Sequence, residues 1–220
     1  MKEFDLYVVR HGQTYYNIYR KMQGWSNTPL TNRGLEDAEK IGNKLSDIKF
    51  DAFYTSDMAR AEKTAKVIHD KNNYSANENI ISSQLLRGAF FGYYEGSNID
   101  ETCHTIAASN GFSSYKKMVQ EAGLGKIKDT FHEVDPFHQA ENNDQYWKRW
   151  DEGFRNIMNN KDITDNGKVL LVSHGPAVLS LVDRFAHGKY DVSVRPKNGS
   201  LTKLHFDKEG SISVLSYNEV

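Results

Sequence analysis

Two short apolar runs, each ending directly in a histidine–glycine pair, limit what this chain can fold into. Residues 6–12 read Leu-Tyr-Val-Val-Arg-His-Gly, and residues 169–175 read Val-Leu-Leu-Val-Ser-His-Gly. Uninterrupted apolar runs of this kind are typical of parallel strands that are covered on both faces. The carboxyl ends of such strands open onto the crevice where α/β proteins bind ligands. A lone histidine at a strand end is usually structural, but the repeated arrangement predicts that His11 and His174 share one site.

Patterns of helix and strand alternate along most of the remaining chain. Thr31 is expected to cap a helix, and Ser56 and Asp57 are expected to cap the helix that follows the second strand. Further strands are predicted near 52–55 and 80–82, with a closing antiparallel hairpin over 201–214. This alternation favours an α/β fold with a mostly parallel central sheet and helices on both faces.

The stretch at about 97–150 interrupts this alternation. It is too long for a connection inside a compact core, and it mixes charged side chains with aromatic ones. We therefore expect one domain over 1–220, in which this stretch forms a partly helical lid over the site. A chain of 220 residues is long enough to bury the core of such a domain.

The composition narrows the expected partners and compartment. The chain has 28 basic and 29 acidic side chains and a formal net charge of −1, so no overall field attracts nucleic acid or a membrane surface. The eight histidines do not show the spacing of a zinc site, and no cofactor is expected. Cys103 is the single cysteine and cannot form an internal disulfide, which favours the cytoplasm. The oligomeric state stays open, with a homodimer as one option.

The segment around the first histidine carries a motif. Residues 10–14, Arg-His-Gly-Gln-Thr, followed by Asn17, resemble a signature of the histidine phosphatase superfamily, in its phosphoglycerate mutase-like branch. The resemblance implies the fold of that family and a phosphohistidine intermediate on His11. An arginine fork suits a phosphate, so Arg10 is expected to bind the transferred group. Thr14 and Asn17 are expected to donate hydrogen bonds to its oxygens.

Further segments resemble the same family. Residues 56–65 place Arg60 in the first turn of a helix, where the helix dipole favours an anion. The Ser-His-Gly triplet around His174 implies a phosphate ligand there. The reversed roles, with this histidine as the nucleophile, are disfavoured because an arginine flanks the first histidine. Gln23 is expected to contact substrate or phosphate, and Gly24 is expected to allow close approach of the backbone.

One segment departs from the family pattern. Residues 86–96 resemble a segment whose third residue is usually a glutamate that donates and accepts a proton, and this chain has Gly88 there. General acid–base help is typically worth about 10²–10⁴-fold in rate. Either another carboxylate serves, or the substrates have good leaving groups, or the protein binds phosphate and barely turns over. Glu95 is the nearest substitute proton donor, although a structural role is the better interpretation. The other candidates are Glu101, Glu133 and Glu141.

These observations predict an enzyme, a metal-independent phosphomonoesterase that hydrolyses small phosphorylated metabolites through phosphohistidine on His11. A phosphoglycerate mutase that depends on 2,3-bisphosphoglycerate is the second hypothesis. The third is a phosphate-ligand sensor with weak activity, and only Gly88 supports it.

Overall fold

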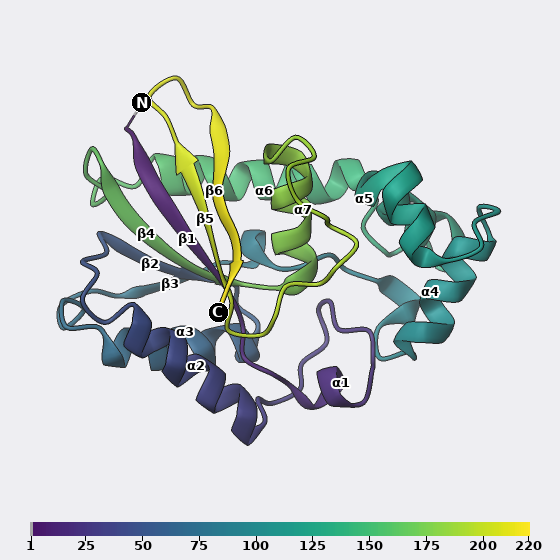
Figure 1. The fold of residues 1–220 in the computed structure, drawn as a ribbon, viewed down its shortest axis with the longest axis horizontal. Helices are drawn as coiled ribbons and strands as arrows, with labels where there is room; N and C mark the ends of the chain where they lie inside the picture. Colours follow the sequence, from purple (N-terminus) through teal and green to yellow (C-terminus); the bar gives the residue numbers. More distant parts are fainter. Residues whose placement is uncertain (1) are drawn as a thin grey trace.

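The computed structural model describes residues 2–220 and contains one six-stranded sheet with the order β3-β2-β4-β1-β5-β6 (Figure 1). The four strands from β3 to β1 run parallel, and β5 and β6 are each antiparallel to the preceding strand in that order. The predicted mostly parallel sheet and closing antiparallel hairpin are therefore confirmed. The strands are β1 (Phe4–Arg10), β2 (Ala52–Thr55), β3 (Ile80–Ser82), β4 (Gly167–Ser173), β5 (Leu201–Phe206) and β6 (Ile212–Glu219).

The two strands that carry the histidines lie side by side in the middle of the sheet. β1 and β4 pair in parallel along their whole length, with Arg10 opposite Ser173. Val8 and Leu171, which are partners in this register, are fully buried, as expected for strands covered on both faces. The register therefore delivers the next residue of each strand, a histidine in both cases, to the same edge of the sheet.

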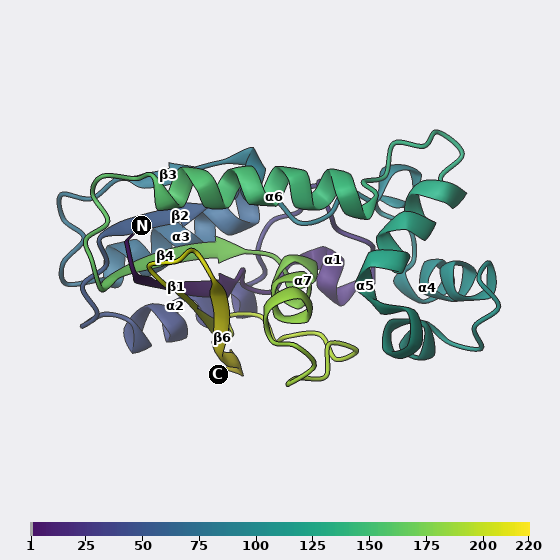
Figure 2. The same cartoon turned by 90° about the horizontal axis from the view of Figure 1, so that it is seen from above.

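Helices cover both faces of the sheet, as Figures 1 and 2 show. α2 and α3 pack on one face, where Ile41 and Ile68 join a buried cluster with Phe53. α6 and α7 pack on the other face, where Phe154 joins a cluster with Leu6. The helices are α1 (Tyr15–Ile18), α2 (Asn32–Lys44), α3 (Ala59–Lys71), α4 (Ile99–Ala108), α5 (Tyr115–Val134), α6 (Asn143–Met158) and α7 (Gly175–Phe185).

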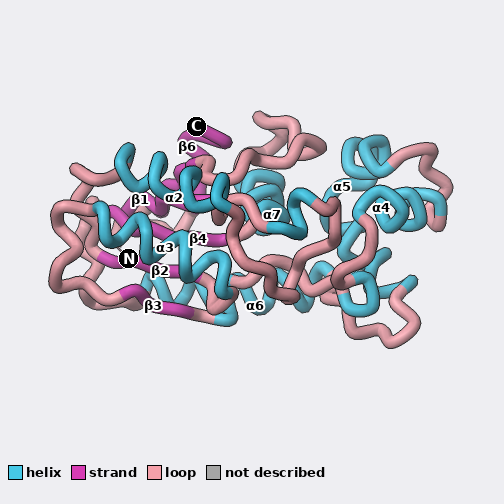
Figure 3. The backbone as a smooth tube through the Cα atoms, turned by 90° about the horizontal axis from the view of Figure 1, so that it is seen from below, coloured by secondary structure: helices cyan, strands magenta, loops and turns pink. Residues whose placement is uncertain are grey.

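The stretch at 97–150 is largely helical and divides into two parts. α4 and α5 lie beyond the carboxyl ends of the strands, at one end of the molecule (Figures 1 and 3). α6 runs across residue 150, the expected end of the stretch. This helix packs on the sheet: Trp150 and Phe154 are buried, and the Phe154 ring lies 5.5 Å from that of Phe206. Only the first part therefore has the position of a lid.

The helix starts agree with the sequence at one place and differ at another. Thr31 caps α2, and its hydroxyl accepts a hydrogen bond from the Gly34 amide at 3.0 Å. The prediction that Ser56 and Asp57 cap α3 is wrong, because the N-cap residue is Met58, with no side-chain cap. The Ser56 side chain bonds to His174 instead, and the Asp57 carboxylate accepts two hydrogen bonds from Arg87. None of the helices within residues 2–220 is long and apolar enough to cross a membrane.

Candidate active site

His11 follows β1 and is held in one tautomer. Its Nδ1 donates to the carbonyl of Gly12 at 2.8 Å, and its Nε2 accepts from the Nε of Arg60 at 3.3 Å. The ring is 4% exposed. Burial, together with the charges of Arg60 and Arg10, holds the pKa of His11 well below its usual value. The imidazole is therefore neutral near pH 7, with its lone pair on Nε2.

His174 follows β4 and occupies the N-cap position of α7. Its Nδ1 accepts from the Nη2 of Arg60 at 3.0 Å, so its Nε2 carries the proton and donates to the Ser56 hydroxyl at 2.7 Å. The ring centroid lies 5.3 Å from that of His11. Burial and the neighbouring Arg60 lower the pKa of His174, which is also neutral. The two predicted histidines therefore do meet in one site.

Arg60 joins the two histidines from the first turn of α3. Its guanidinium is 1% exposed and also donates to the carbonyls of Gly24, at 2.7 Å, and Ser26, at 2.9 Å. Burial lowers the pKa of Arg60 to about 10, so the side chain stays charged at neutral pH. A positive charge at the amino end of a helix, between two neutral imidazoles, is suited to an anion.

Arg10 supplies the second cation, which is half-buried and has a buried Nε. Its Nη1 donates to the Pro196 carbonyl, while its Nε has no hydrogen-bond partner among residues 2–220. A Cβ atom on Gly175 would lie 3.1 Å from this Nε, so the glycine permits the close approach. Burial, with a contribution from Arg195, lowers the pKa of Arg10 to about 10. A buried donor without an acceptor matches the oxygen of an anion.

The neutral residues of the first motif are bound to one another. Thr14 caps α1 in a reciprocal pair with Asn17, and its hydroxyl donates to the Gln23 side chain at 2.7 Å. Asn198, which the sequence reasoning missed, donates to the His11 carbonyl at 2.9 Å and to Asn17 at 3.2 Å. The structure thus gives Thr14 and Gln23 scaffold contacts beside the site. No sequence signal marks Asn198, because it approaches from a loop near the other end of the chain.

Glu95 holds the loop that carries Gly24. Its carboxylate accepts from the backbone amides of Gly24 at 3.1 Å, Trp25 at 2.8 Å and Ser26 at 3.1 Å, and from the Ser26 hydroxyl at 2.7 Å. A Cβ atom on Gly24 would lie 2.2 Å from the carbonyl oxygen of Ala89, so close backbone approach requires the glycine. This set of donors is typical of a structural carboxylate and does not favour Glu95 as the proton donor.

Gly88 lies against the second histidine. A Cβ atom built on it would be 3.3 Å from the Cβ atom of His174. The Gly88 carbonyl accepts from Trp25 and from Arg149, both at 3.0 Å. Of the other carboxylates considered from the sequence, Glu141 forms a two-bond pair with Arg149 at 2.7 Å, and Glu133 is exposed beside Lys126. Glu101, in the first turn of α4, is exposed as well.

A cavity of about 670 Å³ begins at Arg10, the residue before His11, and reaches under α4 and α5, although neither histidine lines it. Arg10 and Asn17 line it together with residues of the 97–150 stretch, so that stretch does contribute walls to the space next to the site. Within residues 2–220, no group of three or more histidine, cysteine or acidic side chains is arranged to hold a metal ion.

The fold and the site together define a class of α/β protein in which two strand-end histidines and two arginines surround a place for an anion. A family model of the histidine phosphatase superfamily (branch 1) matches residues 6–219. The chain belongs to the histidine phosphatase superfamily.

Individual relatives carry different activities in their names. Fructose-2,6-bisphosphatase TIGAR of Xenopus tropicalis is 36% identical over 102 residues, which span 46% of this chain and 37% of that protein. A 2,3-bisphosphoglycerate-dependent phosphoglycerate mutase of Bartonella tribocorum is 38% identical over 124 residues, which span 49% of this chain and 60% of that protein. The match thus covers less than two thirds of either relative.

A solved structure matches nearly the whole chain. The crystal structure of phosphoglycerate mutase from Bacillus anthracis superposes with a TM-score of 0.90 at 28% sequence identity, over 99% of this chain and 94% of that one. The agreement confirms the phosphoglycerate mutase-like fold that the sequence resemblance implies.

Proposed function

We propose that this protein is a phosphomonoesterase that hydrolyses small phosphorylated metabolites through a phosphohistidine on Nε2 of His11, without a metal ion. The observation that carries the proposal is the tautomer of His11. Its Nδ1 proton is bound by the Gly12 carbonyl, so the lone pair of Nε2 faces the guanidinium of Arg60. A neutral, oriented imidazole beside fixed positive charge is the arrangement that in-line attack on phosphorus requires.

The reaction would proceed in two displacements at phosphorus. In the first, Nε2 of His11 forms a bond to phosphorus as the ester oxygen leaves with the electron pair of the broken P–O bond and takes up a proton as the alcohol. In the second, water attacks the phosphohistidine, which releases inorganic phosphate and restores the imidazole. Arg10 and Arg60 would stabilise the charge on the equatorial oxygens, because both cations are fixed before the reaction. His174 would add a hydrogen bond when its Nε2–H turns from the Ser56 hydroxyl to a phosphoryl oxygen.

The leaving group is the weak point of this chemistry. The side chain that would protonate it is missing at Gly88, and Glu95 is bound to backbone amides of the loop at 24–26. We therefore propose that the enzyme turns over esters of acidic alcohols, such as phenols, faster than alkyl esters. The name of the TIGAR relatives supports phosphatase chemistry on a phosphorylated metabolite.

The test is phosphate release from p-nitrophenyl phosphate in the presence of a chelator, for wild type and His11→Ala. His187→Ala, which changes an exposed histidine far along the chain, is the matched control. We expect release with wild type and the control, its loss with His11→Ala, and phosphohistidine at His11 by mass spectrometry of acid-free quenched samples. Equal release from His11→Ala and wild type would contradict the proposal.

The structural agreement with the Bacillus anthracis mutase favours a second candidate, a phosphoglycerate mutase. This reaction needs a phosphohistidine that is first formed from 2,3-bisphosphoglycerate and then returned to the substrate. The two candidates are separated by an assay of the conversion of 3-phosphoglycerate to 2-phosphoglycerate. Phosphorus NMR monitors this conversion with and without the bisphosphate. We expect slow release of phosphate and no 2-phosphoglycerate.

A further inference from the structure

The cavity that begins at Arg10 and Asn198, next to His11, is much larger than a phosphoryl group needs. Its volume of about 670 Å³ falls in the range of about 300–1,000 Å³ that holds drug-sized ligands. Arg10, Asn17 and Asn198 line it next to the site, and the rest extends under α5 and α7. The alcohol part of a phosphate ester bound at His11 would therefore enter this space.

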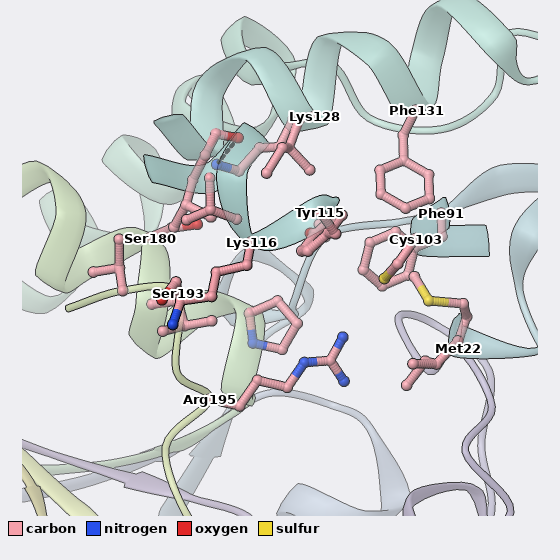
Figure 4. Close-up of a pocket in the computed structure, with 18 of the residues that line it drawn as sticks. Met22, Phe91, Cys103, Tyr115, Lys116, Lys128, Phe131, Ser180, Ser193 and Arg195 are labelled. Carbon is pink, nitrogen blue, oxygen red and sulfur yellow. Dashed lines mark hydrogen bonds between the residues drawn. The ribbon is translucent and has the colours of Figure 1, made fainter. Parts of the chain in front are cut away.

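The middle of the cavity is apolar. α5 bends at Gly123, where φ is 78°, and its second half turns a stripe of side chains with helical spacing toward the cavity. Figure 4 shows Phe131 with Met22 and Phe91 along one side of the cavity. The apolar residues of the wall include Met22, Phe91, Val119, Leu124, Ile127, Phe131, Leu179 and Val192.

Lys128 is a buried cation on this otherwise apolar stripe. The side chain is 7% exposed, and its ammonium makes one long hydrogen bond, 3.3 Å, to the Leu124 carbonyl of its own helix. In the part of the chain that the structure describes, no carboxylate lies within ion-pair distance of it. Burial lowers the pKa of Lys128 to about 8, so it is still mostly charged at pH 7. Burial of a charge without a direct ion pair is costly, and the carboxylates of Asp183, Asp129 and Glu141 act on this ammonium only from a distance. Among residues 2–220 its one hydrogen bond leaves donor capacity for a ligand.

The hydroxyl groups of Tyr146 and Ser180 lie together beside this lysine. The ammonium of Lys128 is 4.8 Å from the centre of the Tyr146 ring, and the buried Tyr146 hydroxyl interacts with the hydroxyl of Ser180. Burial raises the pKa of Tyr146, so this hydroxyl is a donor at any physiological pH. Ser180, which lines the same part of the cavity in Figure 4, adds a hydroxyl. The group that fits here is rich in acceptors and negatively charged.

We propose that Lys128 and Ser180, which both line the cavity, form an anion subsite backed by Tyr146, so that the preferred substrates are phosphomonoesters whose apolar alcohol part carries a second anionic group. This inference rests on the proposed function, because it places the phosphoryl group at His11. A carboxylate and a second phosphate share the required chemistry, and the experiment includes both.

The experiment compares three esters of one shape: 2-naphthyl phosphate, 6-carboxy-2-naphthyl phosphate and naphthalene-2,6-diyl bisphosphate. A hydrogen bond to a charged group is worth roughly a ten- to hundred-fold difference in affinity. We therefore expect the wild-type kcat/KM for one of the two anionic esters to exceed that for 2-naphthyl phosphate by this factor. In Lys128→Met, which keeps an unbranched side chain one atom shorter and removes the charge, KM for the anionic ester should rise by the same factor. The plain ester should change by less than twofold.

Lys117→Met is the matched control, because this lysine is on α5 but is exposed and outside the cavity. Ser180→Ala is a second probe of the subsite, should the exchange at Lys128 disturb folding. Equal kcat/KM for the three esters in wild type would overturn the inference. The inference would also be overturned if the preference for anionic esters persisted in Lys128→Met and disappeared in the double variant Lys116→Met, Arg195→Met. That result would assign the preference to the exposed cations at the cavity mouth.

Failure of the proposed function is a separate result. If wild type cleaves none of the three esters, calorimetric binding of 6-hydroxy-2-naphthoate to wild type and to Lys128→Met tests the subsite without turnover. Binding that the variant loses would support the anion subsite, and absence of binding to wild type would overturn it.

Discussion

Gly88 faces His174 closely enough that any side chain placed there would touch the imidazole: its Cβ atom would lie 3.3 Å from the Cβ atom of the histidine. This distance is tight but needs only a small shift. The side chain of a longer residue would thus start beside the imidazole of His174. The acid is therefore missing at a single residue, and one substitution at Gly88 would supply it.

Gly88→Glu is expected to raise kcat for alkyl phosphates by about ten- to hundred-fold and to change the rate with p-nitrophenyl phosphate little, because only a poor leaving group needs the proton. Steady-state kinetics with both ester classes measure the effect. Gly88→Gln is the control, since it has the same shape without an acidic proton. Equal kinetics for the two variants would show that no acid had been restored.

Single residues also show what the sequence could not supply. The Ser56 hydroxyl was expected to cap α3 because serine is a good cap, but it accepts from His174, which comes from a strand more than a hundred residues away. Lys128 left a detectable signal, a lysine among Leu124, Ile127 and Phe131 at helical spacing. The pattern does not tell whether such a lysine reaches solvent or stays buried, because that depends on what packs against the helix.

At the scale of elements, the loop at 23–27 is held in place by side chains. The backbone amides of the loop donate to Glu95. The loop carbonyls at Gly24 and Ser26 accept from Arg60. The orientation of the arginine thus depends on a carboxylate that touches neither histidine in the contacts described. Glu95 is a positioning residue in this arrangement.

Glu95→Gln is expected to lower kcat/KM by roughly tenfold for aryl and alkyl phosphates alike, because it loosens the loop that orients Arg60 and removes a charge-assisted hydrogen-bond acceptor. A proton donor would behave differently, since its loss harms alkyl esters far more than p-nitrophenyl phosphate. The ratio of the two effects, measured in one set of assays, decides between the roles. A selective loss on alkyl esters would restore Glu95 as the acid.

The elements themselves were the most predictable part of the protein. The runs at 6–9 and 169–172 are apolar throughout, and this local pattern is enough to place two buried parallel strands. The expected boundary at 150 was less accurate, because α6 passes through it without interruption. A helix that packs on the sheet and one that covers a cavity have the same local periodicity, so only the tertiary contacts separate them.

For the whole molecule, the two buried histidines link stability to pH. Both have folded-state pKa values well below 6.5, whereas in the unfolded chain they titrate near 6.5. Below pH 6.5 the unfolded state binds more protons than the folded state, so stability falls as the pH falls through this window.

We expect the free energy of unfolding to decrease between pH 7 and pH 5.5 by up to about 1.4 kcal/mol per pH unit for each of His11 and His174. Urea denaturation at a series of pH values measures it. His174→Asn should reduce the slope by about half, whatever its effect on stability at pH 7.5. A free energy of unfolding that stays constant over this range would contradict the conclusion that both imidazoles are neutral in the folded state.

The pairing of β1 has a consequence for how a newly made chain becomes active. Both neighbours of β1, which are β4 and β5, lie after residue 166, so the first strand has no partner in the sheet until most of the chain has left the ribosome. His11 meets His174 only at that moment. Incomplete chains therefore lack the assembled pair of histidines, so under the proposed function turnover would report that folding has been completed.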